Sequence, residues 1–463
     1  MQEINTQQKD SIAVTLRSYA QTVLITIFGL LPLIFVPLVT VPFEYTKVIV
    51  VVGAVCVALV LLSFSVLRSG TLSVITSYPL LALWTATGIT FLSTLLSDDF
   101  KDSFIGDLFS IHATVFVIIL ALIPTVWMFL KPEKASVMRM YILLATSVVV
   151  LVCFHIARLI GGADILSFSV FNSSVSTPVG SWNDLALFLG LTVIISLVAL
   201  EQLTMKRSGK ILFSTACVLS LIMLAVINFF TVWLLLGLVS LVIIVYILGK
   251  DRFSTPQLPL LGVHGQGNTS LFVALFVFAV SVVFIVGGSI IGGLLAKYTN
   301  VSYVEVRPSF EATLDIARNV YEENAFLGIG TNKFSDGWRL YKDSSLNLTT
   351  FWNTDFNAGN GYLSTFFVTT GVVGGLAWMV FLVLYLVTGI RRLMSPMNID
   401  KTWYFIAVSS FVSALYVWGM SIIYVPGVVI LLFGSLCTGV SLYAFEILNG
   451  NTGKIISIGA NRR

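Results

Sequence analysis

The chain has 463 residues, of which 57% are hydrophobic and only 10% are charged. Soluble domains carry about 25% charged residues, so this composition excludes a soluble globular protein and indicates a membrane protein with many spans. The net charge of +4 gives no basic footprint, and we therefore expect no nucleic-acid partner.

Apolar runs follow one another along most of the chain, and a helix needs about 20 apolar residues to cross the hydrocarbon core. The polar residues before the first run lack a signal-peptide pattern, so the first helix is expected to remain. We predict an all-α polytopic membrane protein with about twelve transmembrane helices. They lie near residues 21–41, 47–67, 75–95, 111–130, 139–160, 183–201, 211–228, 231–248, 271–294, 363–389, 403–421 and 425–446. The seventh and eighth runs are short and nearly contiguous, so they could be two spans or one.

Lysine and arginine set the expected orientation, because cytoplasmic loops are enriched in both. A cytoplasmic N-terminus puts most basic residues of the short loops inside, including Lys131, Lys134, Arg139, Lys206 and Arg207. Both termini are then cytoplasmic. The chain divides into a cytoplasmic segment (1–20), helices one to nine (21–294), a large extracytoplasmic loop (295–362), helices ten to twelve (363–446) and a cytoplasmic tail (447–463).

The four cysteines fall in apolar stretches, at Cys56, Cys153, Cys217 and Cys437. They show no metal-ligand spacing and favour no disulfide framework, so we interpret them as small apolar residues packed among helices or lipid. The sequence predicts neither a bound metal nor a cofactor.

The large loop opens with VRPSFEATLDIARNVYEENAFLGIGTNKF, in which Pro308 suits a first helical turn. Apolar residues then form one stripe at helical spacing, at Phe310, Leu314, Ala317, Val320 and Tyr321. An amphipathic helix is therefore predicted on the outer membrane surface or over a cavity.

Two arginines belong to this predicted helix. Arg307 and Arg318 are about three turns apart, which predicts that they share one face. Guanidinium groups on one face suit bidentate phosphate binding. Arg318 has an alternative as an ion pair with Asp315 or Glu322, whereas Arg307 has no such partner upstream.

The rest of the loop mixes glycine, aromatic and polar residues. Gly328 and Gly330 predict a turn that could expose amides to an anion or be only a turn. Further on lie Lys333, Trp338, Arg339, Tyr341, Trp352 and Asp355. Aromatic residues among polar ones suit sugar faces, and equally suit an aromatic belt at the membrane interface.

The order of these features is informative. An outer-face arginine precedes an aromatic residue, a helix, a Gly-x-Gly-x-x-x-Phe segment and a polar turn that runs into a helix with Gly-x-x-Gly. The residues concerned are Arg307, Phe310, Gly328, Gly330, Phe334, Asn360, Leu363, Gly371 and Gly374. This order resembles the O-antigen ligase and O-antigen polymerase family of bacterial membrane glycosyltransferases, most specifically over residues 305–380.

The resemblance implies a C-type glycosyltransferase-like fold in the bacterial cytoplasmic membrane and metal-independent chemistry. Such enzymes transfer a glycan from undecaprenyl diphosphate to an acceptor hydroxyl of a lipid, glycan or protein on the outer face. By motif position Arg307 is the first candidate for the diphosphate. Secondary candidates are Arg318, Lys333, Arg339, Arg158 and Lys47, and candidate sugar contacts are Trp338, Tyr341 and Trp352.

The chain departs from the family at one catalytic position. The family places His-Asn-x-x-Leu in the polar turn, whereas this chain reads AGNGYL, with Gly359 or Asn360 at the histidine position. Neither residue is a base, although Asn360 stays a candidate for the site.

Other residues could supply the missing base. His112 and His155 lie near outer helix ends, where a lone histidine is more often an interfacial residue. His155, one turn from Arg158, is still a possible substitute, as is Asp355. Three accounts remain open: the base has moved, the acceptor is activated without one, or the protein binds the lipid-linked glycan without catalysis.

A transporter of lipid-linked glycans is the competing class. Transporters often hold ionisable residues near the bilayer midplane, whereas here charges cluster at span ends. A long loop late in the chain also disfavours a protein of two equivalent halves. Ligase and polymerase differ in their acceptor, and the sequence leaves that choice open.

Overall fold

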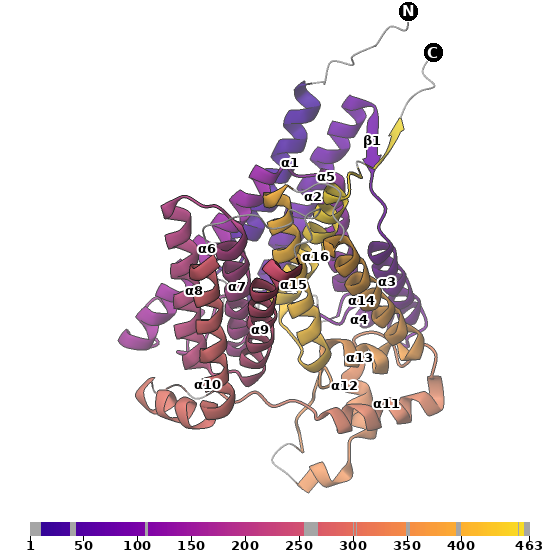
Figure 1. The fold of residues 1–463 in the computed structure, drawn as a ribbon. Helices are drawn as coiled ribbons and strands as arrows, with labels where there is room; N and C mark the ends of the chain where they lie inside the picture. Colours follow the sequence, from indigo (N-terminus) through magenta and orange to yellow (C-terminus); the bar gives the residue numbers. More distant parts are fainter. Residues whose placement is uncertain are drawn as a thin grey trace, which may run out of the picture.

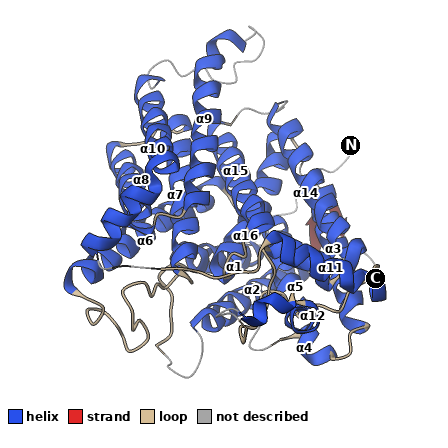
Figure 2. Cartoon of the chain, turned by 90° about the horizontal axis from the view of Figure 1, so that it is seen from below, coloured by secondary structure: helices blue, strands red, loops and turns tan. Residues whose placement is uncertain are grey.

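The computed structural model describes residues 11–37, 43–106, 110–253, 267–299, 301, 303–348, 352–394, 400–451 and 453–457. Helices dominate this part of the chain (Figures 1 and 2). They are α1 Ser11–Leu30, α2 Phe43–Ser69, α3 Tyr78–Leu95, α4 Phe100–Phe104, α5 Thr114–Leu130, α6 Lys134–Gly161, α7 Trp182–Gln202, α8 Arg207–Ile227, α9 Phe230–Phe253, α10 Gly267–Thr299, α11 Phe310–Asn324, α12 Phe334–Tyr341, α13 Tyr362–Thr369, α14 Gly371–Met394, α15 Lys401–Ile423 and α16 Val428–Leu448. A short 3-10 helix spans Ser344–Leu348, and two strands are β1 Thr71–Val74 and β2 Lys454–Ser457.

The prediction of a polytopic helical membrane protein is confirmed. In the described part of the chain, 11 helices are long and apolar enough to cross a membrane, and α5 is a shorter apolar helix. The seventh and eighth runs form separate helices, α8 and α9. Asn228 ends α8 in the left-handed region (φ 53°), and its side-chain amide donates to the Gly288 carbonyl (2.7 Å).

Two predicted spans are wrong in extent. The first, predicted at 21–41, is α1 and ends at Leu30, close before Pro32, which lacks the amide donor that a further helical turn would use. The tenth, predicted as continuous over 363–389, is divided into α13 and α14. At this break Gly371 has φ 66°, and a Cβ there would lie 2.5 Å from the Phe326 backbone.

The centre of the bundle is formed by α7 and α16, the most deeply buried of the long helices. Small residues let α16 approach its neighbours closely, as transmembrane helix packing requires. A Cβ at Gly439 would lie only 2.6 Å from Pro124 Cα on α5. Hydroxyl groups add hydrogen bonds, such as Trp418 Nε1 to Thr438 Oγ1 (2.9 Å). The core is therefore fixed by both shape and polar contacts.

The two ends of the bundle differ (Figure 1). At one end, β1 pairs antiparallel with β2, with Thr71 opposite Ser457. At the other end lie α4, α11 and α12, which group together in the view from below (Figure 2). The strands, which the sequence analysis did not predict, bring residues after α2 and after α16 to the same side. The loop between α10 and α13 lies opposite them, as the span count requires.

The loop between α10 and α13 packs around a small core that it shares with α13, formed by Ile316, Ala317, Val320, Phe334, Trp338 and, from α13, Val368. The predicted stripe on α11 is partly wrong, because Phe310 and Leu314 are exposed whereas Thr313 and Ile316 are buried. The helix begins at Phe310, two residues after Pro308, so Pro308 is not in its first turn. Ser309 is the N-cap residue, and its side chain accepts from the Ala312 amide (3.0 Å). The buried face of α11 therefore turns toward α12 and α13.

Candidate functional site

A cavity of about 320 Å³ lies at the end of the bundle that carries α11 and α12. Four segments that are distant in sequence line it: residues 110–112 before α5, 305–308 before α11, 355–359 before α13, and Val425 between α15 and α16. Its ionisable lining residues are His112, Glu305, Arg307 and Asp355. Helix ends and loops thus converge on one polar pocket.

The segment before α11 presents its side chains in alternating directions. Val304 and Val306 are exposed, at 82% and 45%. The side chains of Glu305 and Arg307 are only 21% and 22% exposed and ion-paired with each other. The correction to the sequence analysis is that Arg307 precedes α11, so it does not share a helical face with Arg318.

Three neighbours hold the Arg307 guanidinium. Its Nε and Nη2 donate to Glu305 Oε1, and Nη2 also donates to the Val425 carbonyl (3.1 Å). Its Cζ lies 3.7 Å from the Tyr424 ring centroid, in a cation–π contact. The buried Nη1 has no hydrogen-bond partner among the described residues. The guanidinium is thus oriented with one donor group unused.

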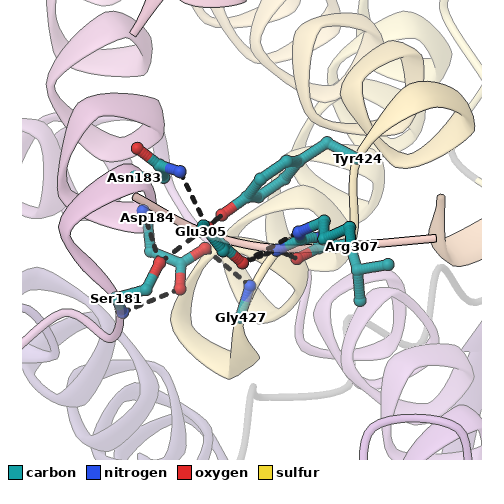
Figure 3. A network of polar contacts seen from close by, with 8 residues as sticks. Ser181, Asn183, Asp184, Glu305, Arg307, Tyr424 and Gly427 are labelled. Carbon is teal, nitrogen blue, oxygen red and sulfur yellow. Dashed lines mark hydrogen bonds and ion pairs between the residues drawn. The ribbon is translucent and has the colours of Figure 1, made fainter. Parts of the chain in front are cut away.

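Glu305 is at the centre of the polar network in Figure 3. Its Oε2 accepts from Asn183 Nδ2 (2.7 Å) and from the Tyr424 hydroxyl (2.9 Å). Burial raises the pKa of Tyr424, so that hydroxyl stays protonated and remains a donor. Both oxygens of the Glu305 carboxylate therefore have partners, with Arg307 on Oε1 and two donors on Oε2.

Asp184 anchors the same network to α7 and α16 (Figure 3). Its Oδ2 accepts from the Ser181 amide (2.9 Å), while the Ser181 hydroxyl accepts from the Asp184 amide (3.0 Å), which forms a capping box. Asp184 Oδ1 also accepts from the Gly427 amide (2.7 Å). A Cβ at Gly427 would lie 2.5 Å from Asp184 Oδ2, so only glycine permits this approach.

His112 also lines the cavity, directly before α5. Its ring centroid lies 4.9 Å from that of Tyr362 and 5.7 Å from that of Phe366. His112 is 2% exposed, and its Nε2 has no hydrogen-bond partner within the described part of the chain. Burial and the positive charge of Arg307 lower the pKa of His112 to about 3, against a smaller opposing effect of a hydrogen bond with the Tyr362 backbone.

The polar turn before α13 closes the cavity. The Gly359 amide donates to Thr365 Oγ1 (3.0 Å) and the Asn360 amide to Thr313 Oγ1 (2.9 Å). A Cβ at Gly359 would lie 2.5 Å from Thr313 Cγ2. The turn is therefore packed tightly against α11, and no histidine side chain fits at position 359 in this arrangement.

Asp355 lines the cavity from the rim of the loop. Arg339 donates to it through Nε (3.1 Å) and Nη2 (2.7 Å). The hydrogen bond from Arg339 lowers the pKa of Asp355. Asp355 is thus placed near Arg307, as a base candidate should be, but its ion pair with Arg339 makes it a weak proton acceptor.

Most other loop candidates are bound to local partners away from the cavity lining. Arg318 pairs with Asp315 (2.8 Å) on the exposed side of α11, the alternative that its spacing indicated. Lys333 pairs with Asp102 (2.8 Å). The aromatic candidates lie apart: Trp338 is buried and donates to the Thr354 carbonyl (3.0 Å), Tyr341 donates to Glu323 (2.7 Å), and Trp352 is 59% exposed.

Three candidates on the long helices also have structural contacts. Arg158 is buried and donates to the carbonyls of Ala163, Phe171, Ser173 and Ser176. Lys47 donates to the Leu31 carbonyl (2.7 Å). His155 is fully buried beside Trp182, with a centroid distance of 5.7 Å. The cavity lining contains none of the three.

Sequence reasoning missed Glu305, Asn183 and Tyr424, and it ranked His112 below His155. One signal was available, because Asn183 and Asp184 follow a serine at the start of an apolar helix and form its predicted first turn. No local signal connects Glu305 with Tyr424, since their pairing depends on the tertiary fold.

Comparison of the chain with models of known protein families and with curated proteins finds no match. In the described part of the chain, no group of three or more His, Cys, Asp or Glu is placed to hold a metal ion. The site must therefore be interpreted from its own residues: an oriented arginine with an unused donor group, and a buried histidine with an unused nitrogen atom, in one cavity.

Proposed function

We propose that this multi-pass membrane protein is a glycosyltransferase of O-antigen ligase type. It takes a glycan from undecaprenyl diphosphate and joins it to an acceptor hydroxyl of a lipid, a glycan or a protein. The site lies at the extracytoplasmic face of the bacterial cytoplasmic membrane, with both termini in the cytoplasm. The main support is Arg307, whose guanidinium is fixed by Glu305 and Tyr424 while Nη1 is left for an anion.

The chemistry of the cavity fits a diphosphate leaving group. When a glycosyl bond to diphosphate breaks, negative charge develops on the departing oxygen, and a fixed donor stabilises that charge best. Arg307 satisfies this requirement, because its contacts with Glu305, Val425 and Tyr424 exist before any ligand arrives. Little reorganisation is then needed during the reaction.

Apolar residues beside Arg307 suit the lipid part of such a donor. Val304, Val306 and Phe310 are exposed at 82%, 45% and 63%. They flank Glu305 and Arg307, the ion pair that lines the cavity. The cavity edge formed by residues 304–310 therefore combines polar and apolar groups, as an isoprenoid diphosphate does. A soluble sugar nucleotide would leave the apolar edge without a function.

The test is a transfer assay on the full chain in nanodiscs. A panel of undecaprenyl-diphosphate oligosaccharides serves as donor, a panel of lipid, glycan and peptide hydroxyls as acceptor, and release of undecaprenyl diphosphate is measured. We expect acceptor-dependent release with at least one donor. Release of undecaprenyl diphosphate that does not depend on the acceptor would contradict the proposed transferase activity. So would the absence of release with every combination of donor and acceptor. Binding without release would favour a non-catalytic or transport function.

A further inference from the structure

The cavity contains four ionisable residues, and transfer to a hydroxyl needs one of them as a proton acceptor. Arg307 has a guanidinium group, which offers hydrogen-bond donors and no acceptor. Glu305 uses Oε1 for Arg307 and Oε2 for Asn183 and Tyr424. Asp355 is held by Arg339 at 2.7 Å. His112 is the remaining group, and its Nε2 lacks a partner among the described residues.

Position supports the same choice. His112 lines the same cavity as Arg307, and its ring lies against that of Tyr362, which directly follows the polar turn 357–361. That turn has no ionisable side chain, and Gly359 leaves no room for one. The turn therefore supplies no base. The imidazole ring of His112, from the segment before α5, lies beside it.

We infer that Nε2 of His112 accepts the proton of the acceptor hydroxyl during glycan transfer. The inference rests on the proposed function. The acceptor oxygen forms a bond to C1 of the donor sugar, and the bond from C1 to the diphosphate oxygen breaks. The electron pair of that bond leaves with the diphosphate, beside Arg307, and the hydroxyl proton goes to His112. The products are the new glycoside and undecaprenyl diphosphate, and solvent or the diphosphate later takes the proton.

Electrostatics couple donor binding to the strength of this base. The positive charge of Arg307 contributes to the low pKa of His112. A diphosphate on Arg307 neutralises that charge and adds negative charge nearby, so the pKa of His112 rises toward neutrality. His112 is then a neutral ring before the donor binds and a stronger proton acceptor afterwards.

The experiment compares His112→Asn, His112→Ala and wild type in the same nanodisc assay. We expect His112→Asn to lower kcat about 100-fold, in the range typical of a lost general base, with donor KM changed less than about threefold. We expect added imidazole to restore part of the transfer by His112→Ala. His155→Ala is the matched variant, because it removes a buried imidazole outside the cavity lining, and imidazole should not raise its rate.

The outcomes separate the inference from the proposed function. An active wild type with His112→Asn at the wild-type kcat overturns the inference alone. A His112→Asn effect confined to donor KM also overturns it and makes His112 a binding residue. A wild type that transfers no glycan from any donor overturns the proposed function, and the inference with it.

Discussion

Two arginines near the same end of the bundle show how differently one side chain is used. Arg158 donates to four backbone carbonyls of the loop after α6, the closest at 2.7 Å, and lies over the rings of Phe154 and Phe171. Arg307 contacts one carboxylate, one carbonyl and one ring. It lines the cavity, and its buried Nη1 has no hydrogen-bond partner in the described residues.

The surroundings distinguish the structural contacts of Arg158 from those of Arg307, the proposed anion ligand, more clearly than burial does. Arg158 is fully buried, and its terminal donors organise residues 163–176. Arg307 is held as firmly, but its partners lie on one edge and one face of the guanidinium. Each arginine has one buried nitrogen without a hydrogen-bond partner among the described residues, Nε in Arg158 and Nη1 in Arg307. Only Arg307 lines the cavity, and a firmly oriented guanidinium at a cavity is the property expected of an anion site. Five substitutions test this comparison.

Arg307→Leu has the largest expected effect. Loss of a fixed donor to a developing anion costs about 10²–10³-fold in transfer. The protein should still fold, because Glu305 keeps its Asn183 and Tyr424 contacts. The measurement is the transfer rate per folded molecule, with the amount of folded protein determined by size-exclusion chromatography. Activity within a factor of a few of wild type would place the diphosphate elsewhere.

Arg158→Leu should affect stability instead. Four carbonyls lose a charged donor inside the protein, and we expect a loss of about 3 kcal/mol in the free energy of unfolding. A thermal melt in detergent reports this as a lower Tm, while the transfer rate of the surviving folded protein stays close to wild type. If Arg158→Leu left the stability unchanged but abolished transfer, Arg158 and not Arg307 would be the arginine needed for function.

Gly359→His places a histidine where the family resemblance implies one. Its Cβ would lie 2.5 Å from Thr313 Cγ2, and overpacking of this kind costs about 1–3 kcal/mol. We expect a lower Tm and no gain in transfer. Gly359→Ala is the control for size alone. Higher activity in Gly359→His would show that the turn can open and that His112 is not needed.

Glu305→Gln tests how far Arg307 depends on its orientation. The amide keeps its size but loses the charge that pairs with Arg307. We expect transfer to fall about tenfold, equivalent to about 1.4 kcal/mol, mainly through kcat. Kinetics at saturating donor and acceptor measure this change. A rate at or above the wild-type value would mean that Glu305 competes with the ligand for Arg307.

Arg318→Leu has the smallest expected effect of the five substitutions. Arg318 and Asp315 are 67% and 52% exposed, and exposed pairs of this kind contribute at most about 1 kcal/mol. Tm and the transfer rate should both stay close to wild type. A tenfold loss of transfer would extend the site along α11 and weaken the case for Arg307 as the principal cation.

The sequence predicted the helical membrane fold and most spans, because each apolar run carries its own hydropathy signal. It failed at Pro32 and Gly371, where backbone chemistry overrides hydropathy. Arg307 was chosen as the first candidate by its motif position, but it was expected on the helix itself and not before it. His112 was ranked below His155, because its proximity to Tyr362 joins residues about 250 positions apart, and only tertiary packing creates that contact.

The central claim is that Arg307 binds a lipid-linked diphosphate. Its most direct test is a titration of undecaprenyl diphosphate onto the full chain in nanodiscs, with wild type, Arg307→Leu and Arg318→Leu compared side by side. The account predicts that only Arg307→Leu raises Kd by about tenfold or more, the loss of one charged contact. Equal Kd values for all three proteins would contradict it.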